Sequence, residues 1–209
     1  GETEEFKECY SNGRSVGLVQ GEASVGLIVM ELAKMTLLDL LKTLPAGTVL
    51  PVEESIRILL EVLQGIQEMH QLGIAHRDLK AENILLMADG IVKLVTSEVP
   101  FLGHRMFSLQ AAALQRYEEE FDRTTTLIYR PPEMIDTRRG WSIGAKVDVW
   151  MFGCVAFMLA FGRHPFQEQG KLAIVNASYS LQPSEVKDSP LAPIIKATLV
   201  PNPSLRPTA

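Results

Sequence analysis

The stretch His76–Pro100, HRDLKAENILLMADGIVKLVTSEVP, decides the fold of this chain. Its second half contains two short apolar runs on either side of Asp89-Gly90, a pattern that is typical of a β-hairpin. Upstream of the stretch, apolar residues recur every three or four positions across residues 51–72, which predicts a helix. The charged segment HRDLKAEN therefore forms a loop that connects a helix to a hairpin.

Apolar segments on both sides of this stretch predict a domain that is mainly helical. Strands are expected at 26–32, 84–87 and 91–95, and helices at 36–44, 51–72 and 145–161. The last helix is apolar on nearly all sides, which favours a place at the centre of the domain. Its most apolar part, Val149–Phe161, is 13 residues long. A membrane span needs about 20 residues, so we expect a buried core helix instead.

Composition and charge exclude several classes of protein. The chain has 209 residues, of which 46% are hydrophobic, enough for a substantial core. Its formal net charge of -5 argues against a general nucleic-acid-binding role. Cys9 and Cys154 lack metal-ligand spacing, and no leader-type segment opens the chain. We therefore expect reduced thiols in a cytoplasmic protein without a membrane span.

The segment His76–Asn83 matches the catalytic loop of protein kinases, so the chain resembles that superfamily. The resemblance implies an α+β, protein-kinase-like fold, mainly the helical large lobe with a remnant of the small-lobe sheet. It implies that Asp78 orients a substrate hydroxyl and accepts its proton, and that Lys80 reaches the transferring phosphate. Asn83 would ligate Mg²⁺ through its amide oxygen, with ATP and Mg²⁺ as cofactors.

Further motifs follow at the positions that the resemblance requires. Three segments resemble the end of the activation segment, the start of the central helix and the turn after it: Tyr129–Glu133, Asp148–Gly153 and Gly162–Phe166. By resemblance, Asp148 ties down the backbone of the catalytic loop. Glu133 is expected to form a buried, structural ion pair with Arg206.

Lys80 indicates the serine/threonine branch of the superfamily. So does Thr126, which falls where such kinases place a Thr that contacts the catalytic Asp. Within that branch, Thr124–Asp136 and Gly170–Leu181 resemble the Numb-associated kinase family, which includes the adaptor-associated and cyclin-G-associated kinases. The resemblance runs from about residue 26 to 207. It implies protein substrates, with clathrin-adaptor and other trafficking proteins as candidate partners.

The same resemblance divides the chain and implies a nucleotide pocket. Residues 1–32 would be the end of a small lobe with the hinge, and residues 33–209 a large lobe that lacks its terminal helix. By resemblance, Met30 would be the gatekeeper of this pocket. Glu31 and Ala33 would be hinge residues that offer a backbone carbonyl and an amide to adenine, and Leu85 would lie under the adenine ring. Plain core packing is an alternative role for Met30 and Leu85, and both roles are compatible.

The pattern breaks where the hairpin ends. Kinases carry Asp-Phe-Gly at a position that, counted from Asp78, falls on Thr96-Ser97-Glu98. A Thr hydroxyl is neutral and substitutes poorly for a carboxylate that binds Mg²⁺. Losing a main metal ligand should cost orders of magnitude in rate, since about 1.4 kcal/mol is tenfold. We therefore expect no appreciable kinase activity from the chain as it stands.

Three interpretations remain open. The first is a pseudokinase that acts as a protein-binding scaffold or regulator. It fits a chain without a glycine-rich phosphate loop, a strand Lys or a helix Glu. The second is an active kinase whose sequence is truncated and locally misjoined around residues 95–105, which fits the otherwise intact catalytic loop. The third is a structural module unrelated to kinases.

Four hydroxyl residues of the expected activation segment are candidate phosphorylation sites: Ser97, Ser108, Thr124 and Thr125. A phosphate on any of them is expected to pair with Arg77. Ordinary polar loop residues are the simpler interpretation of each.

Overall fold

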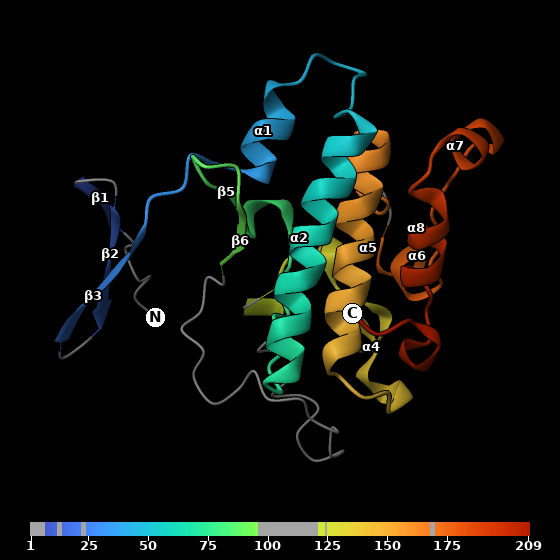
Figure 1. Cartoon of the computed structure of the whole chain (residues 1–209). Helices are drawn as coiled ribbons and strands as arrows, with labels where there is room; N and C mark the ends of the chain where they lie inside the picture. Colours follow the sequence, from blue (N-terminus) through green and yellow to red (C-terminus); the bar gives the residue numbers. More distant parts are fainter. Residues whose placement is uncertain (1–6, 12–13, 22–23, 96–120, 124, 168–169) are drawn as a thin grey trace.

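The computed structural model describes residues 7–11, 14–21, 24–95, 121–123, 125–167 and 170–209 (Figure 1). These residues form a mainly helical body and two antiparallel sheets. The first sheet has the order β1-β2-β3, with β1 (Lys7–Ser11), β2 (Arg14–Gly21) and β3 (Ser24–Glu31). The second has the order β4-β5-β6, with β4 (Met35–Thr36), β5 (Ile84–Leu86) and β6 (Val92–Leu94).

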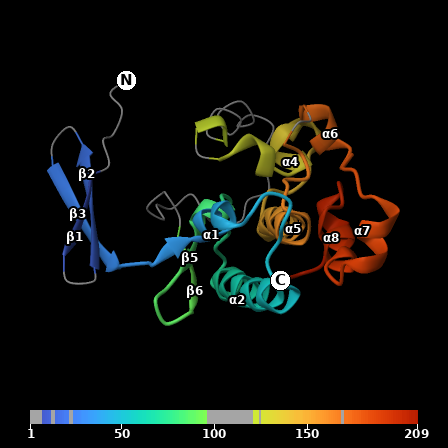
Figure 2. The same ribbon diagram turned by 90° about the horizontal axis from the view of Figure 1, so that it is seen from above.

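The helices surround one central helix, α5. The α-helices are α1 (Leu37–Thr43), α2 (Val52–Gln71), α4 (Pro132–Ile135), α5 (Ala145–Phe161), α6 (Lys171–Val175), α7 (Pro183–Asp188) and α8 (Ala192–Thr198). Both α2 and α8 pack against α5, and β6 packs against α2 (Figures 1 and 2). The first sheet lies beside this body (Figure 2). The mixture of a helical body with small sheets agrees with the expected α+β class.

The α5 helix occupies the centre because its sequence has no polar face. Twelve of its 17 residues are buried, as the apolar pattern predicts. Gly153 is needed where α5 meets α8, because a Cβ there would lie 2.4 Å from Thr198 Oγ1 and 2.9 Å from Leu199 Cδ2. Within the described ranges, no helix has both the length and the apolar character of a membrane span.

The helices α1 and α2 lie within one residue of the bounds that the sequence predicts. Thr36 caps α1: its hydroxyl accepts from the Asp39 N–H, and the Asp39 carboxylate accepts from the Thr36 N–H, both at 3.1 Å. In α2, however, Ile56 and Leu60 belong to the apolar spacing that predicts the helix, yet they are 38% and 60% exposed. The face that packs into the core consists of Ser55, Ile58, Leu59, Val62 and Ile66.

Charged side chains of α2 fix the β5–β6 hairpin to the helix. The Glu61 carboxylate accepts from the Val92 N–H at 2.7 Å, and the Arg57 guanidinium donates to the Gly90 carbonyl at 2.8 Å. Arg57 and Glu61 also form an ion pair with each other at 2.5 Å. Because the hairpin leads directly to residue 96, these bonds fix the strand that precedes that position relative to α2.

A buried histidine makes the stability of the helical body depend on pH. His164 packs edge-on against Tyr129, with ring centroids 4.5 Å apart, and its Nδ1 accepts from the Phe166 N–H at 3.1 Å. Its Nε2 is buried and has no hydrogen-bond partner among the residues that the structure describes, and burial lowers the pKa of His164 from 6.5 to about 4. Between these values the unfolded chain binds a proton that the folded chain does not. Acidification from about pH 6.5 toward pH 4 therefore favours unfolding.

We expect His164→Asn to reduce this pH dependence. The Asn side-chain oxygen can replace Nδ1 as an acceptor, while the titrating group and its ring contacts are lost. The variant should be less stable at neutral pH, but its free energy of unfolding should fall less steeply below about pH 6.5. The wild type should lose on the order of 1 kcal/mol more per pH unit, measurable by urea unfolding at several pH values. Equal slopes for the two proteins would contradict this assignment.

Candidate active site

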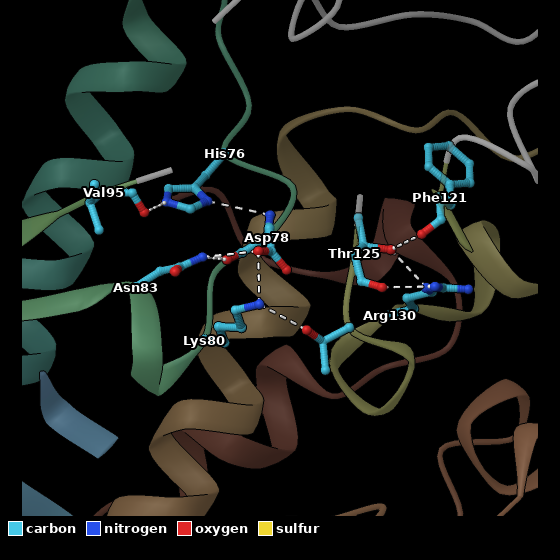
Figure 3. A network of polar contacts seen from close by, with 9 residues as sticks. His76, Asp78, Lys80, Asn83, Val95, Phe121, Thr125 and Arg130 are labelled. Atoms are coloured by element: carbon cyan, nitrogen blue, oxygen red, sulfur yellow. Dashed lines mark hydrogen bonds and ion pairs between the residues drawn. The ribbon is translucent and has the colours of Figure 1, made fainter. Parts of the chain in front are cut away.

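The loop between α2 and β5 brings together three of the four side chains that the sequence predicts to be catalytic, Asp78, Lys80 and Asn83 (Figure 3). The fourth is Thr126. Asn83 Nδ2 donates to the Asp78 carbonyl at 2.7 Å and to Asp78 Oδ2 at 2.9 Å. Lys80 Nζ lies 3.1 Å from the same Oδ2. The second carboxylate oxygen, Asp78 Oδ1, is buried and has no hydrogen-bond partner within the described part of the chain. One oxygen of this carboxylate is therefore oriented by its neighbours, and the other is left to accept from another group.

Thr126 reaches this group through Lys80. Its Oγ1 accepts a hydrogen bond from Lys80 Nζ at 2.9 Å. Among the described residues no hydrogen bond joins Thr126 to Asp78, so the direct contact expected from the sequence is replaced by one through the ammonium group. Lys80 thereby links the catalytic loop to the segment that precedes α4.

A buried carboxylate of α5 holds the catalytic loop, which confirms the role predicted for Asp148. This side chain accepts from the His76 N–H at 2.8 Å and from the Arg77 N–H at 2.7 Å. His70, in the last turn of α2, adds a contact from its Nε2 to Asp148 Oδ2 at 2.7 Å. Arg77 has a φ of 62°, which is uncommon for a residue with a side chain. Such a conformation persists where the surrounding contacts determine it, and the bonds to Asp148 are contacts of that kind.

The catalytic loop also fixes the point at which the chain leaves β6. The Val95 N–H donates to the Asn83 carbonyl at 3.0 Å, and His76 Nε2 donates to the Val95 carbonyl at 3.1 Å. Consecutive Cα atoms are only about 3.8 Å apart, so residue 96 follows directly from a residue bonded to the loop on both sides. Thr96-Ser97-Glu98 themselves lie outside the described residues.

The described residues fit one part of a magnesium site. Asn83 uses its Nδ2 to bond to Asp78, which leaves its side-chain oxygen for a cation. Amide and carboxylate oxygens are suitable ligands for Mg²⁺. Within the described ranges there is no group of three or more His, Cys, Asp or Glu suited to a metal ion. The further carboxylate that kinases supply corresponds to position 96, where this chain has Thr.

The residues expected around adenine lie where the first sheet joins the helical body. Met30 and Glu31 end β3, and Met30 is 40% exposed. Ala33 lies between β3 and β4, and β4 pairs with β5, the strand of Leu85. An ion pair between Glu31 and Lys93 adds a link from the end of β3 to β6. Met30, Glu31 and Ala33 thus lie at the end of β3 or in the connection to β4, and Leu85 lies on β5, just after the catalytic loop in the chain order. Their contact with a nucleotide stays a prediction.

The ion pair between Glu133 and Arg206 is confirmed. Both side chains are fully buried, and they are joined by two bonds of 2.6 and 2.7 Å. Arg206 also donates to the carbonyls of Val200, Lys146 and Pro201 at 2.7, 2.8 and 2.9 Å. All five N–H groups of the guanidinium are therefore used, and the pair joins α4 to the end of the described chain.

Three of the candidate phosphorylation sites, Ser97, Ser108 and Thr124, lie outside the described residues. The fourth, Thr125, donates its hydroxyl to the Phe121 carbonyl and accepts from Arg130 Nε, both at 2.7 Å. The basic side chain bonded to the unmodified Thr125 hydroxyl is thus Arg130. Pairing of a phosphate with Arg77 stays a prediction.

Two residues of this site had no role in the sequence-based predictions. His70 had only a weak local signal, since a basic side chain in the last turn of a helix is favourable. Nothing in the sequence indicates that it faces Asp148, which is 78 positions away. Arg130 was part of a recognised motif, but its bonds to the preceding segment become visible only in the folded chain.

In this loop, a Lys and an Asn contact the carboxylate of one Asp, and a buried Asp from the central helix anchors the loop backbone. This arrangement is typical of a kinase-type phosphotransferase fold. Comparison with known families agrees with this class: residues 14–209 match the protein kinase domain. The chain belongs to the protein kinase family, and its α+β fold is protein-kinase-like, with the helical part predominating.

Serine/threonine kinases are among its relatives. A probable serine/threonine-protein kinase of Dictyostelium discoideum is 34% identical over 174 residues, which cover 79% of this chain and 15% of that protein. A second such kinase from the same organism is 35% identical over 178 residues, which cover 83% of this chain and 22% of that protein. Actin-regulating kinase 1 of Saccharomyces cerevisiae is 33% identical over 156 residues, covering 74% and 24%. This chain therefore spans less than a quarter of the length of each of these relatives.

Proposed function

We propose that this chain is a serine/threonine protein kinase domain whose phosphoryl transfer is severely impaired, because Thr96 stands where its metal site needs a carboxylate. The observation that carries the proposal is the position of Val95, whose N–H and carbonyl are both bonded to the catalytic loop. Residue 96 is covalently attached to Val95, whose N–H and carbonyl are bonded to Asn83 and His76. The loop is otherwise arranged for chemistry, with Asp78 Oδ1 unpartnered and Lys80 beside the same carboxylate.

The proposed reaction transfers a phosphoryl group to a Ser or Thr hydroxyl of a protein substrate. Asp78 orients the hydroxyl through Oδ1 and takes its proton, while Lys80 faces the transferring phosphate. ATP supplies the phosphoryl group, and Mg²⁺ neutralises its charge when both are bound. Asn83 would hold a metal ion through its side-chain oxygen. The adenine would lie among Met30, Glu31, Ala33 and Leu85.

The finer assignment is the Numb-associated kinase family, on the segments Thr124–Asp136 and Gly170–Leu181. Residues 1–32 would then be the end of the small lobe with the hinge, and residues 33–209 the large lobe. Substrates among clathrin-adaptor and trafficking proteins follow from that resemblance, and a cytoplasmic location is proposed from the two cysteines expected to be reduced thiols. The similarity to a yeast kinase named for actin regulation adds actin-associated proteins as a second group of candidate substrates.

A second candidate function is a pseudokinase that acts as a protein-binding scaffold or regulator. The observation in its favour is how the fold is held together. Asp148 and the Glu133–Arg206 pair anchor the loop and α4 through protein groups alone. Because these contacts need neither nucleotide nor metal, the surfaces around the loop and α4 would stay available for binding a partner protein.

Thr96→Asp tests the proposal by restoring the carboxylate. We expect ATP with Mg²⁺ to raise the Tm of this variant by about 2–4 °C more than ATP alone, which corresponds to about 1 kcal/mol in a chain of this size. The wild type should show no Mg²⁺-dependent rise. Ser97→Asp adds the same charge one residue further along and should behave as the wild type does.

Phosphorylation of a threonine peptide distinguishes the remaining outcomes. In the Thr96→Asp chain, adding Asp78→Asn should abolish any such activity but leave the Mg²⁺-dependent shift in Tm. Activity of the wild type that requires Mg²⁺ and is lost in Asp78→Asn would refute the proposed impairment. Absence of a Mg²⁺-dependent shift in Thr96→Asp would refute the role given to residue 96 and favour the pseudokinase.

A further inference from the structure

Arg130 is a buried cation that makes no contact with the catalytic carboxylate. Its side chain is 6% exposed, and its side-chain bonds run back to the segment just before it (Figure 3). Nε donates to Thr125 Oγ1 and Nη2 donates to the Thr125 carbonyl, both at 2.7 Å, while Nη1 forms an ion pair with Asp122. Because a guanidinium is costly to bury unless it is paired, these bonds strongly constrain the segment they hold.

The Thr125 carbonyl connects this arginine to the active site. The carbonyl belongs to the planar peptide group that joins Thr125 to Thr126, so the bond from Nη2 sets the orientation of that plane. Thr126 then presents its Oγ1 to Lys80 at 2.9 Å, and Lys80 lies 3.1 Å from Asp78. A change at Arg130 is thereby passed to Lys80 through a single peptide group.

The segment is closed at both ends. On the N-terminal side, Phe121 is 3% exposed, and its carbonyl accepts from both the N–H and the hydroxyl of Thr125 at 3.0 and 2.7 Å. On the C-terminal side, the Tyr129 N–H donates to the Thr126 carbonyl at 3.0 Å and begins the short turn that leads to Arg130. Phe121 thus holds the N-terminal side of the segment and the turn at Tyr129 holds its C-terminal side. Arg130 joins the two sides through its bonds to Thr125 and Asp122.

Asp122 supplies the opposite charge for Arg130. It lies eight positions before the arginine, and its side chain is 67% exposed. The hydrogen bond from Arg130, together with its charge, holds the pKa of the Asp122 carboxyl below its ordinary value. The carboxylate is therefore ionised at neutral pH, and the pair needs no modification of the chain to form.

We propose that Arg130 is a positioning residue that places Thr126 against Lys80, and that the Asp122 carboxylate supplies the charge this arginine requires, so that the segment reaches this geometry without an added phosphate. A phosphorylated side chain can order a loop by pairing with an arginine, and here a carboxylate of the chain takes that place. The geometric part stands on the contacts above, and its consequence for catalysis rests on the proposed function.

The test compares variants of the unmodified chain, with the absence of phosphate checked by intact mass. Asp122→Asn removes the charge and keeps the shape, and Asp122→Glu restores the charge. The matched control is Asp136→Asn, which breaks the pair between Asp136 and Arg139, an exposed ion pair within the same part of the chain. Two readouts are used: amide hydrogen exchange at residues 125, 129 and 130, and the rate at which an amine-reactive reagent modifies Lys80.

We expect Asp122→Asn to accelerate exchange at those amides by about tenfold, the scale set by weakening a charge-assisted hydrogen bond, with little change in α2 or α5. Lys80 should become more reactive because it loses Thr126 as a partner. Asp122→Glu should return both readouts toward the wild type, and Asp136→Asn should change neither.

Wild-type exchange and labelling in Asp122→Asn would overturn the proposal, since Arg130 would then need no carboxylate. A uniform acceleration across all helices would also overturn it, because that marks a general loss of stability. Amide exchange and Lys80 labelling are both measured without nucleotide. They therefore test this proposal whether or not Thr96→Asp shows a Mg²⁺-dependent shift in Tm. If that variant is active, adding Asp122→Asn should lower kcat for the peptide with little effect on KM for ATP.

Discussion

Glu133→Gln is expected to lower the free energy of unfolding by about 3–5 kcal/mol, the usual cost of removing one partner from a buried ion pair. Glutamine offers one acceptor oxygen where the carboxylate offers two, and its NH₂ group would face an N–H of Arg206. The guanidinium then keeps its charge in a fully buried site without a counter-charge. Since a folded domain has about 5–15 kcal/mol in total, this loss is a large share of the stability.

Urea unfolding of Glu133→Gln and the wild type measures this difference directly. Glu54→Gln is the matched control, because Glu54 and Arg57 form an ion pair whose side chains are 40% and 39% exposed. An exposed pair of this kind contributes less than about 1 kcal/mol. A loss at Glu133 no larger than the loss at Glu54 would contradict the structural role of the buried pair.

Asp148→Asn is expected to destabilise the chain by about 3 kcal/mol or more and to release the catalytic loop. The carboxylate serves three donors: the backbone N–H groups of His76 and Arg77 and the ring of His70. An Asn side chain has one acceptor oxygen, and each buried donor left without a partner costs about 1–3 kcal/mol. The backbone of Arg77, with its φ of 62°, would lose the bonds that hold it.

Two measurements test this prediction. Urea unfolding gives the loss of stability, and amide hydrogen exchange at His76 and Arg77 shows whether the loop is released before the rest of the chain unfolds. His70→Gln serves as a partial variant, because it removes only the third contact and leaves both backbone donors bonded. If the two substitutions have equal effects, the backbone bonds to Asp148 are not what holds the loop.

Most of the helical framework could be predicted because its signals are local. The bounds of α5 follow from an apolar run between Gly144 and Gly162, and the start of α1 follows from the Thr36–Asp39 capping box. The face of α2 that enters the core could not be predicted in the same way. Ile56 and Leu60 have helical spacing, but the packing of α2 against α5 and the hairpin decides which side is buried.

The site could be predicted only in part, for a similar reason. The motif identified Asp78, Lys80 and Asn83, and the structure brings them into contact because they lie within one loop. Thr126 was expected to contact Asp78 but is bonded to Lys80, and the contacts of Arg130 were not predicted. Which group a long side chain meets depends on how its segment is turned, and that is set by bonds such as the one from Arg130 to the Thr125 carbonyl.

The sequence alone specified α1, α2, α5, the hairpin and the catalytic segment, because caps, turns and apolar periodicity act over a few residues. It also determined that position 96 is a threonine. Only the tertiary structure decided what that loop is attached to: His70 meets Asp148 across 78 positions, and Lys80 meets Thr126 across 46. Contacts over such distances form because α5 is buried at the centre and brings the loop, α2 and the segment before α4 to one place.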